Sequence, residues 1–316
     1  MEIIDKLHNF GIVPVIAIDS KEAAALLAIA LCKGGLAVAE VTYRTSCAHD
    51  ALKEMKRVCP QMLLGAGTVL NRGQVDSAID AGAEFIVSPG LNTDVVEYCI
   101  EKNILVIPGC ATPSDIERAI ELGLKTVKFF PSEANGGLKA IKAMSAPYSD
   151  ITFMPTGGIN EENLNSYLEF DKIIACGGTW MINKAYIENK EYKKIEELVH
   201  DSISKMLNIH LAHVGLNTKT KSKKLAKKMS EFSLVNCDER KNSIFVGDLE
   251  LMINPTRGEY GHLAYSTTNI ERAKFFMENA GIIFDKETAM YDEKGKLKFI
   301  YTNECINGFA IHLIKE

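Results

Sequence analysis

The chain has 316 residues, of which 47% are hydrophobic and 24% are charged, and its formal net charge is −5. This length suits two domains, and the composition is that of a globular chain that buries a full core. The negative charge gives no general attraction to nucleic acid or to an acidic membrane, and no apolar run is long enough to cross a bilayer. Because the first residues are acidic and amphipathic rather than a secretory signal, we expect a cytoplasmic protein.

The eight cysteines are spread along the chain, and none are paired in a C-x-x-C motif. Redox motifs and structural zinc sites need closely spaced cysteines. We therefore expect reduced and mostly buried thiols.

Up to about residue 205, short apolar runs alternate with amphipathic segments. The runs cover residues 12–18, 38–44, 63–69, 85–90, 105–110, 126–132, 151–158 and 173–179, and helical patterns between them include residues 22–33, 48–59, 74–81, 93–102 and 114–122. This alternation favours a parallel sheet covered by helices, and eight such pairs fit a closed (β/α)8 TIM barrel. An open doubly wound sheet is the alternative, but it needs a glycine-rich turn after the first strand, which residues 18–21 do not supply.

After about residue 206 the charge balance turns from net negative to net positive, which predicts domains at 1–207 and 208–316. A lysine run, Lys219 to Lys228, has the spacing of a solvated helix face, with an interaction patch as the less favoured interpretation. A weak repeat follows: a strand at residues 213–217, a helix, then strands ending at 249–252. The same order recurs in residues 262–314. We predict a smaller α+β domain of two tandem βαβββ units.

Two charged residues stand inside apolar strands. Lys128, between Val127 and Phe129, is either a snorkelling or structural ammonium or a buried amine that attacks a carbonyl. Glu40 is costly in such a strand unless it is paired or catalytic, and Glu40, Thr42 and Arg44 share one strand face. The residues therefore permit either a Glu40–Arg44 ion pair or a general acid/base beside an anion-binding arginine.

Glycine pairs follow the last two predicted strands of the first domain, at Gly157-Gly158 and Gly177-Gly178. In a barrel these two loops commonly hold a phosphate group on backbone N–H groups. Tight turns without a ligand are the alternative.

Residues 1–205 resemble the family of 2-keto-3-deoxy-6-phosphogluconate (KDPG) and 4-hydroxy-2-oxoglutarate (KHG) aldolases. The shared stretches, in order, are residues 12–16, 40–45, 65–69, 88–90, 107–109, 128–134, 155–159 and 177–180. The resemblance implies a class I aldolase that releases pyruvate and an aldehyde, needs no cofactor or metal for this reaction, binds a small keto-sugar acid and forms a homotrimer.

The resemblance also implies roles for individual residues. Lys128 matches the Schiff-base lysine and Glu40 the acid/base, and the remaining substrate contacts match Arg44, Thr68, Pro89, Phe130, Thr156, Gly157, Gly158, Gly177, Gly178 and Thr179. Arg44 and Thr68 would hold the carboxylate, Pro89 would form a wall, and the glycine loops would hold the phosphate. Thr179 departs from the usual serine, and its methyl group would crowd a phosphate.

The tandem units are similar to the vicinal oxygen chelate (glyoxalase-like) fold, in which each unit gives one ligand from its first strand and one from its last. By position the ligands are His213, Glu250, His262 and His312, the last in place of the usual glutamate. This set suits zinc or another divalent transition metal. The alternative is a non-catalytic metabolite-binding or assembly module, in which these side chains are solvated or capped.

Overall fold

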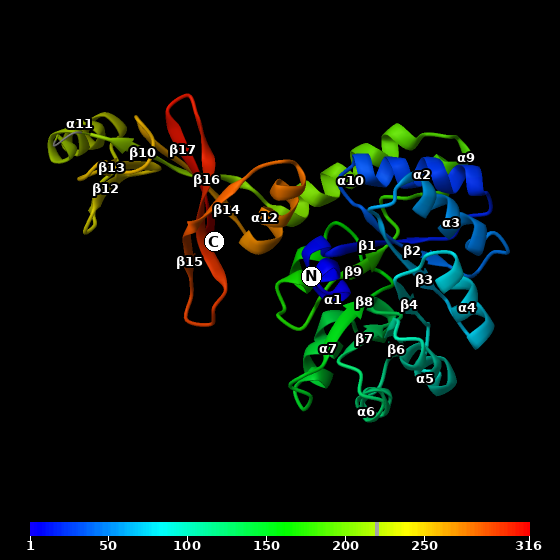
Figure 1. Ribbon diagram of the computed structural model, residues 1–316. Helices are drawn as coiled ribbons and strands as arrows, with labels where there is room; N and C mark the ends of the chain where they lie inside the picture. The colour runs from blue at the N-terminus through cyan, green and yellow to red at the C-terminus, as the bar shows by residue number, and fades with distance from the viewer. Residues whose placement is uncertain (219–220) are drawn as a thin grey trace. The chain divides into compact units, whose positions relative to one another are not determined.

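The computed structural model describes residues 1–218 and 221–316, and Lys219 of the predicted lysine run lies outside these ranges. The chain forms two compact units, Met1–Met206 and Leu207–Glu316 (Figure 1). Within the described residues, no helix has both the length and the apolar character needed to span a membrane. All eight cysteines are free, with Cys59, Cys99, Cys110 and Cys176 buried.

The first unit is a ring of parallel strands (Figure 1). They are β1 (Ile12–Ile16), β2 (Val38–Thr42), β3 (Leu63–Gly67), β4 (Phe85–Val87), β5 (Leu105–Ile107), β6 (Gly109–Cys110), β7 (Thr126–Phe129), β8 (Thr152–Pro155) and β9 (Cys176–Gly178). All residues of β1, β2 and β3 are buried, as expected for strands covered on both faces. The predicted (β/α)8 barrel is confirmed.

The ring consists of a six-stranded sheet, which ends in β5 and β9, and the three-stranded sheet β6-β7-β8, and the two sheets are joined at both ends. Parallel bridges from Phe153 to Ile173 and from Thr156 to Gly177 join β8 to β9, which in turn pairs with β1. The predicted fifth strand is divided into β5 and β6 at Pro108, because proline has no N–H to give to a ladder. The Pro108 carbonyl nevertheless accepts a hydrogen bond of 2.8 Å from the Lys128 N–H of β7. The segment from β5 to β6 therefore fills one strand position of the barrel.

Helices surround the strands. They are α1 (Ile3–Phe10), α2 (Lys21–Lys33), α3 (Ala48–Val58), α4 (Arg72–Asp80), α5 (Thr93–Glu101), α6 (Pro113–Glu121), the short 3-10 helix η1 (Glu133–Asn135), α7 (Gly137–Ser145), α8 (Leu164–Leu168), α9 (Lys184–Glu188) and α10 (Tyr192–Leu207). Local signals fix several starts: Ser20 caps α2 by accepting from the Ala23 N–H, and Thr112 and Asp115 form a capping box on α6.

The second unit is an eight-stranded sheet with the order β11-β12-β13-β10-β14-β17-β16-β15. Its elements are β10 (His210–Asn217), α11 (Ser222–Ser233), β11 (Cys237–Glu239), β12 (Ser243–Val246), β13 (Leu249–Met252), β14 (Gly261–Thr267), α12 (Ile270–Asn279), β15 (Phe284–Tyr291), β16 (Leu297–Ile306) and β17 (Phe309–Lys315). The order β-α-β-β-β therefore occurs twice. On α11, Ala226 packs with Ile244, Val246 and Leu251, while its lysines lie on exposed positions.

Candidate functional site

The centre of the barrel holds one charged pair. Lys128 on β7 and Glu40 on β2 come from opposite staves, and Lys128 Nζ lies 3.2 Å from Glu40 Oε1. The two residues are 5% and 0% exposed, whereas Glu40 Oε2 has no hydrogen-bond partner among the described residues. Gly67 makes room for this pair, because a Cβ there would lie 2.1 Å from Glu40 Oε1. The result is a buried amine beside a carboxylate that retains a free oxygen.

Arg44 does not pair with Glu40, so the sequence alternative of a Glu40–Arg44 ion pair is wrong. Glu40 faces Lys128, and the exposed Arg44 donates from Nε to Thr68 Oγ1 at 3.4 Å. Thr68 has a positive φ of 56°, which turns the chain directly after β3. The Phe130 ring lies 5.2 Å from Lys128 Nζ. Arg44, Thr68 and Phe130 thus follow the carboxyl ends of three different strands.

The glycine loops are held by backbone hydrogen bonds. The Ser132 N–H donates to the Thr156 carbonyl at 2.8 Å, and the Glu133 N–H donates to the Gly157 carbonyl at 3.0 Å. Gly157 and Gly158 both adopt left-handed conformations, with φ of 97° and 82°. The Thr156 hydroxyl is buried without a hydrogen-bond partner in the described part of the chain. A polar group of a bound ligand would satisfy it.

A cavity of about 690 Å³ includes in its lining Thr42 and Phe130, each two residues after a member of the buried pair. It is lined by Val15, Ile16, Ala17, Thr42, Arg44, Phe130, Thr156, Gly157, Gly158, Ile159, Gly177, Gly178, Thr179, Trp180, Ile182, Asn183, Lys184 and Ile187. Of the predicted site residues in the barrel, Glu40, Thr68, Pro89 and Lys128 are absent from this lining. Pro89 packs against Gly109, where a Cβ would lie 2.1 Å from the Pro89 carbonyl. The size suits a small ligand with several polar groups.

Sequence reasoning missed Trp180, Asn183 and Lys184 in this lining. Their position in the sequence could have predicted them, because they follow the last strand of the barrel and therefore lie at the edge where ligands bind. Trp180 is held by a hydrogen bond of 2.9 Å from its Nε1 to Ser202 Oγ. Lys184 adds a positive charge to the lining beside that of Arg44, and its Nζ lies 3.4 Å from Glu188 Oε1.

In the second unit, the four predicted ligands meet on four adjacent central strands. Strand register places Glu250, Gly215 and His262 in one row, and His213, Ala264 and His312 in the next. The middle residue of each row is small. Gly215 is required here, because a Cβ would lie 2.1 Å from His262 Cε1. The sheet therefore leaves space for side chains from both rows to converge.

The distances within this cluster are short. Glu250 Oε2 lies 3.2 Å from His213 Nε2 and 3.0 Å from His262 Nε2, and the two Nε2 atoms are 3.2 Å apart. The three histidines offer ring nitrogens that all lie within 4.8 Å of one another. His312 is 2% exposed, and neither ring nitrogen has a hydrogen-bond partner among the described residues.

Burial and neighbouring charges act on the ionisable groups of the cluster. Burial, followed by the adjacent His262 and His213 rings, lowers the pKa of His312 to about 3. Burial alone would raise the pKa of Glu250, but hydrogen bonds from His213, His262 and Ser243 together hold that pKa below its usual range. A neutral histidine beside an ionised carboxylate is the protonation state that binds a metal ion.

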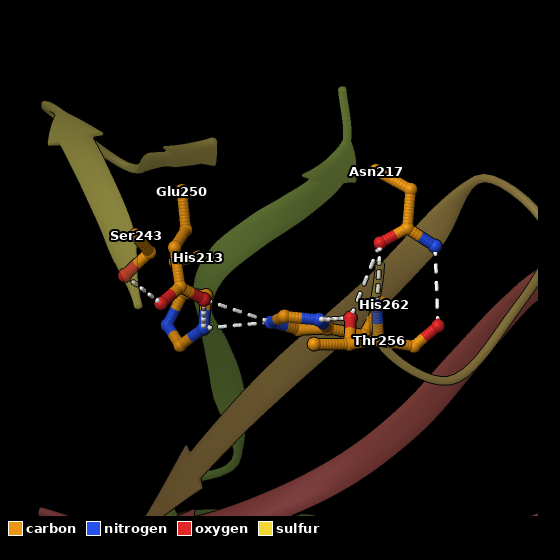
Figure 2. Close-up of polar contacts among 6 residues, drawn as sticks. All are labelled: His213, Asn217, Ser243, Glu250, Thr256 and His262. Carbon is orange, nitrogen blue, oxygen red and sulfur yellow. Dashed lines mark hydrogen bonds and ion pairs between the residues drawn. The ribbon is translucent and has the colours of Figure 1, made fainter. Parts of the chain in front are cut away.

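Two further polar contacts were not predicted from the sequence. Ser243 Oγ donates to Glu250 Oε1 at 2.6 Å, and Thr256 Oγ1 lies 3.4 Å from His262 Nδ1 (Figure 2). Ser243 and Thr256 lie outside the strand positions that the repeat makes equivalent, so no sequence signal distinguished them.

Comparison with known proteins concerns the first unit. The family model described as "KDPG and KHG aldolase" matches residues 3–198. The 2-dehydro-3-deoxy-phosphogluconate aldolase of Haemophilus influenzae is 45% identical over 202 residues, which are 64% of this chain and 95% of the relative. The KHG/KDPG aldolase of Escherichia coli is 41% identical over 192 residues, which are 61% of this chain and 90% of the relative.

Solved structures agree. A KDPG aldolase from Legionella pneumophila, with pyruvate captured as a covalent carbinolamine, matches with a TM-score of 0.61 and 36% identity over 64% of this chain and 98% of its own. The Zymomonas mobilis enzyme with 3-phosphoglycerate matches with a TM-score of 0.59 and 39% identity over 64% and 95%. The chain therefore belongs to the family of KDPG and KHG aldolases, and is a class I aldolase.

Proposed function

We propose that the first unit cleaves KDPG, KHG or both, giving pyruvate with glyceraldehyde 3-phosphate or glyoxylate. The observation that carries this proposal is the buried Lys128–Glu40 pair next to a cavity whose lining includes the cationic Arg44 and Lys184. Arg44 and Thr68 suit the substrate carboxylate. The loops at Thr156, Gly157, Gly158, Gly177, Gly178 and Thr179 suit the distal phosphate or carboxylate.

In the proposed mechanism, Lys128 Nζ adds to the C2 ketone and the carbinolamine loses water to form an iminium ion. The C3–C4 bond then breaks, its electrons move toward the iminium nitrogen, and Glu40 takes the proton of the C4 hydroxyl. The aldehyde leaves, the enamine is protonated at C3, and water releases pyruvate from Lys128. The contact of 3.2 Å between Nζ and Glu40 Oε1 supports this role, because it holds the carboxylate beside the amine that reacts.

The test is reductive trapping. Borohydride with pyruvate should attach a reduced pyruvyl group to the peptide that contains Lys128, and Lys128→Ala should lose at least about 10³-fold in kcat. Lys125→Ala, at an exposed position three residues away, is the control and should retain activity. Trapping on another lysine, or full activity in Lys128→Ala, would disprove the mechanism.

We further propose that residues 1–207 and 208–316 are separate domains, and that the aldolase domain forms a homotrimer, as the family resemblance implies. Light scattering on the full chain tests the oligomeric state.

As a second function, we propose that residues 208–316 form a vicinal oxygen chelate domain that binds a divalent transition metal. The specific observation is the convergence of Glu250 Oε2, His213 Nε2 and His262 Nε2, with both His312 ring nitrogens buried and unpaired. Ligands at about 2.0–2.1 Å from a tetrahedral ion are roughly 3.3 Å apart, close to the separations observed. A metal in this place would polarise a carbonyl or activate a bound water.

Elemental mass spectrometry on protein purified without a metal-affinity tag tests this proposal. We expect near-stoichiometric metal that is lost in His213→Ala and His262→Ala but kept in His210→Ala, a control on the same strand whose ring contacts Ser266 instead. A lack of binding after incubation with zinc, manganese, nickel or iron would favour the alternative, a non-catalytic metabolite-binding or assembly module.

A further inference from the structure

Two ligands of the cluster are each held from behind by a polar neighbour. Glu250 uses Oε1 to accept from Ser243, so that Oε2 alone faces the histidines. His262 has Thr256 at Nδ1 and turns Nε2 toward Glu250 Oε2 (Figure 2). Outer partners of this kind orient metal ligands and select the tautomer of a histidine. The partner of His262 matters because an imidazole has two neutral tautomers, and only one of them leaves Nε2 free to bind a metal ion.

Thr256 is fixed by a single side chain, that of Asn217 at the end of β10. Asn217 Oδ1 accepts from the Thr256 N–H at 2.8 Å and lies 3.4 Å from Thr256 Oγ1 (Figure 2). Asn217 Nδ2 donates to the carbonyls of Thr256 at 3.2 Å and Gly258 at 2.9 Å. Because a backbone N–H can only donate and a carbonyl can only accept, these contacts leave one orientation for the amide, with Oδ1 toward Thr256.

That orientation determines the direction of the next hydrogen bond. Thr256 Oγ1 lies 3.4 Å from both Asn217 Oδ1 and His262 Nδ1. Because Oδ1 can only accept, the contact with Asn217 uses the hydroxyl proton and offers Nδ1 the lone pairs of the hydroxyl oxygen. In this arrangement the hydroxyl oxygen accepts from His262 Nδ1, which carries the proton of the ring. The neutral ring consequently has its lone pair on Nε2, the atom that faces the cluster.

The consequence at the cluster is electrostatic. Without a metal ion, a proton on His262 Nε2 bridges to Glu250 Oε2 at 3.0 Å, whereas the tautomer with its proton on Nδ1 turns the lone pair of Nε2 toward Oε2. A cation between Nε2 and Oε2 relieves the resulting repulsion, whereas the opposite tautomer would satisfy it with an internal hydrogen bond and compete with a metal ion.

We propose that Asn217 and Thr256 are positioning residues, which hold His262 in the Nδ1–H tautomer and so prepare Nε2 to bind a divalent transition metal. This inference rests on the metal site proposed for the second domain and is independent of aldol cleavage. It extends that site beyond its four ligands to two residues that never touch the ion.

The experiment measures zinc affinity of the full-length chain by competition with a chromophoric chelator. Thr256→Val keeps the shape and removes the hydroxyl, and should weaken zinc binding about 10–100-fold. Thr256→Ser restores the hydroxyl and should return the affinity to within a few-fold of wild type. Thr302→Val is the control, since the Thr302 hydroxyl donates to the Glu304 and Ile311 carbonyls rather than to a residue of the cluster.

A second measurement needs no variant. Nitrogen-15 NMR of the histidine side chains should show His262 protonated at Nδ1 in the zinc-bound wild type. Wild-type affinity in Thr256→Val, or a proton on His262 Nε2 in the zinc-bound protein, would overturn the positioning role while the metal site stands. If the wild type binds no zinc at all, the metal site itself fails, and the positioning role fails with it.

Discussion

The substitution Gly67→Ala tests the confinement of Glu40, the proposed acid/base. Gly67 pairs in register with Thr42, and its missing side chain faces Glu40 on the adjacent strand. An alanine Cβ would lie 2.1 Å from Glu40 Oε1, 2.6 Å from Cγ and 2.7 Å from Cδ. Since Glu40 is fully buried and contacts Lys128 through that same Oε1, the new methyl group can be accommodated only by displacing the carboxylate.

The displacement sets the size of the effect. Moving Oε1 out to an ordinary contact distance requires about 1 Å, and a misplacement of that size costs on the order of 10²-fold in rate. Overpacking should also lower the free energy of unfolding by about 1–3 kcal/mol. We therefore expect kcat/KM for KDPG cleavage to fall about 100-fold in a protein that still folds.

Coupled lactate dehydrogenase assays of pyruvate release measure the rate, and circular dichroism melts measure the stability. Gly73→Ala is the control, because its Cβ would meet only Asn71 Oδ1 at 3.4 Å on an exposed position of α4. It should leave the rate unchanged and stabilise the helix slightly. A kcat/KM of Gly67→Ala within about threefold of wild type, with unchanged melting, would refute the confinement of Glu40.

Three further outcomes follow from the two sites. Glu40→Gln keeps the volume but removes the proton acceptor, and should lower kcat about 10²–10⁴-fold while borohydride still traps pyruvate on Lys128; an unchanged kcat would contradict the acid/base role. Gly215→Ala would drive its Cβ to 2.1 Å from His262 Cε1 and should weaken zinc binding at least about tenfold in a competition assay, so equal affinity would argue against His262 as a ligand. Dialysis against EDTA should remove metal from the second domain and leave pyruvate release intact; a parallel loss of cleavage would show that the aldolase itself needs a metal.

The barrel was predictable because its strands are buried on both faces. Such strands read as continuous apolar runs, and a charge inside one, as at Lys128 or Glu40, is visible in the sequence. The break at Pro108 was also encoded locally but was interpreted as one strand. The sequence could not resolve which side chain pairs with Glu40. Arg44 is close to Glu40 in the sequence but contacts Thr68, whereas the actual partner, Lys128, is 88 residues away.

In the second unit, too, the elements and the ligands were predictable but the contacts around the ligands were not. The repeat predicted two βαβββ units, and the resemblance to the vicinal oxygen chelate fold implied His213, Glu250, His262 and His312 as ligands. It could not predict Asn217 or Thr256, because their role depends on the path of the turn between β13 and β14. The sequence also did not show why Gly215 and Ala264 are small. The strand register shows that each lies between two ligand positions, where it leaves space for their side chains.

The Lys128–Glu40 contact joins residues 88 positions apart, on staves that face each other across the ring. A partly folded barrel that ends before β7 holds a buried carboxylate with no cation, and one that lacks β2 holds an ammonium with no anion, both costly states. We therefore expect aldolase activity to appear only when β2 and β7 are both packed in the closed barrel. During refolding, the circular dichroism signal of the helices should recover first, and pyruvate release should recover later, when the barrel closes.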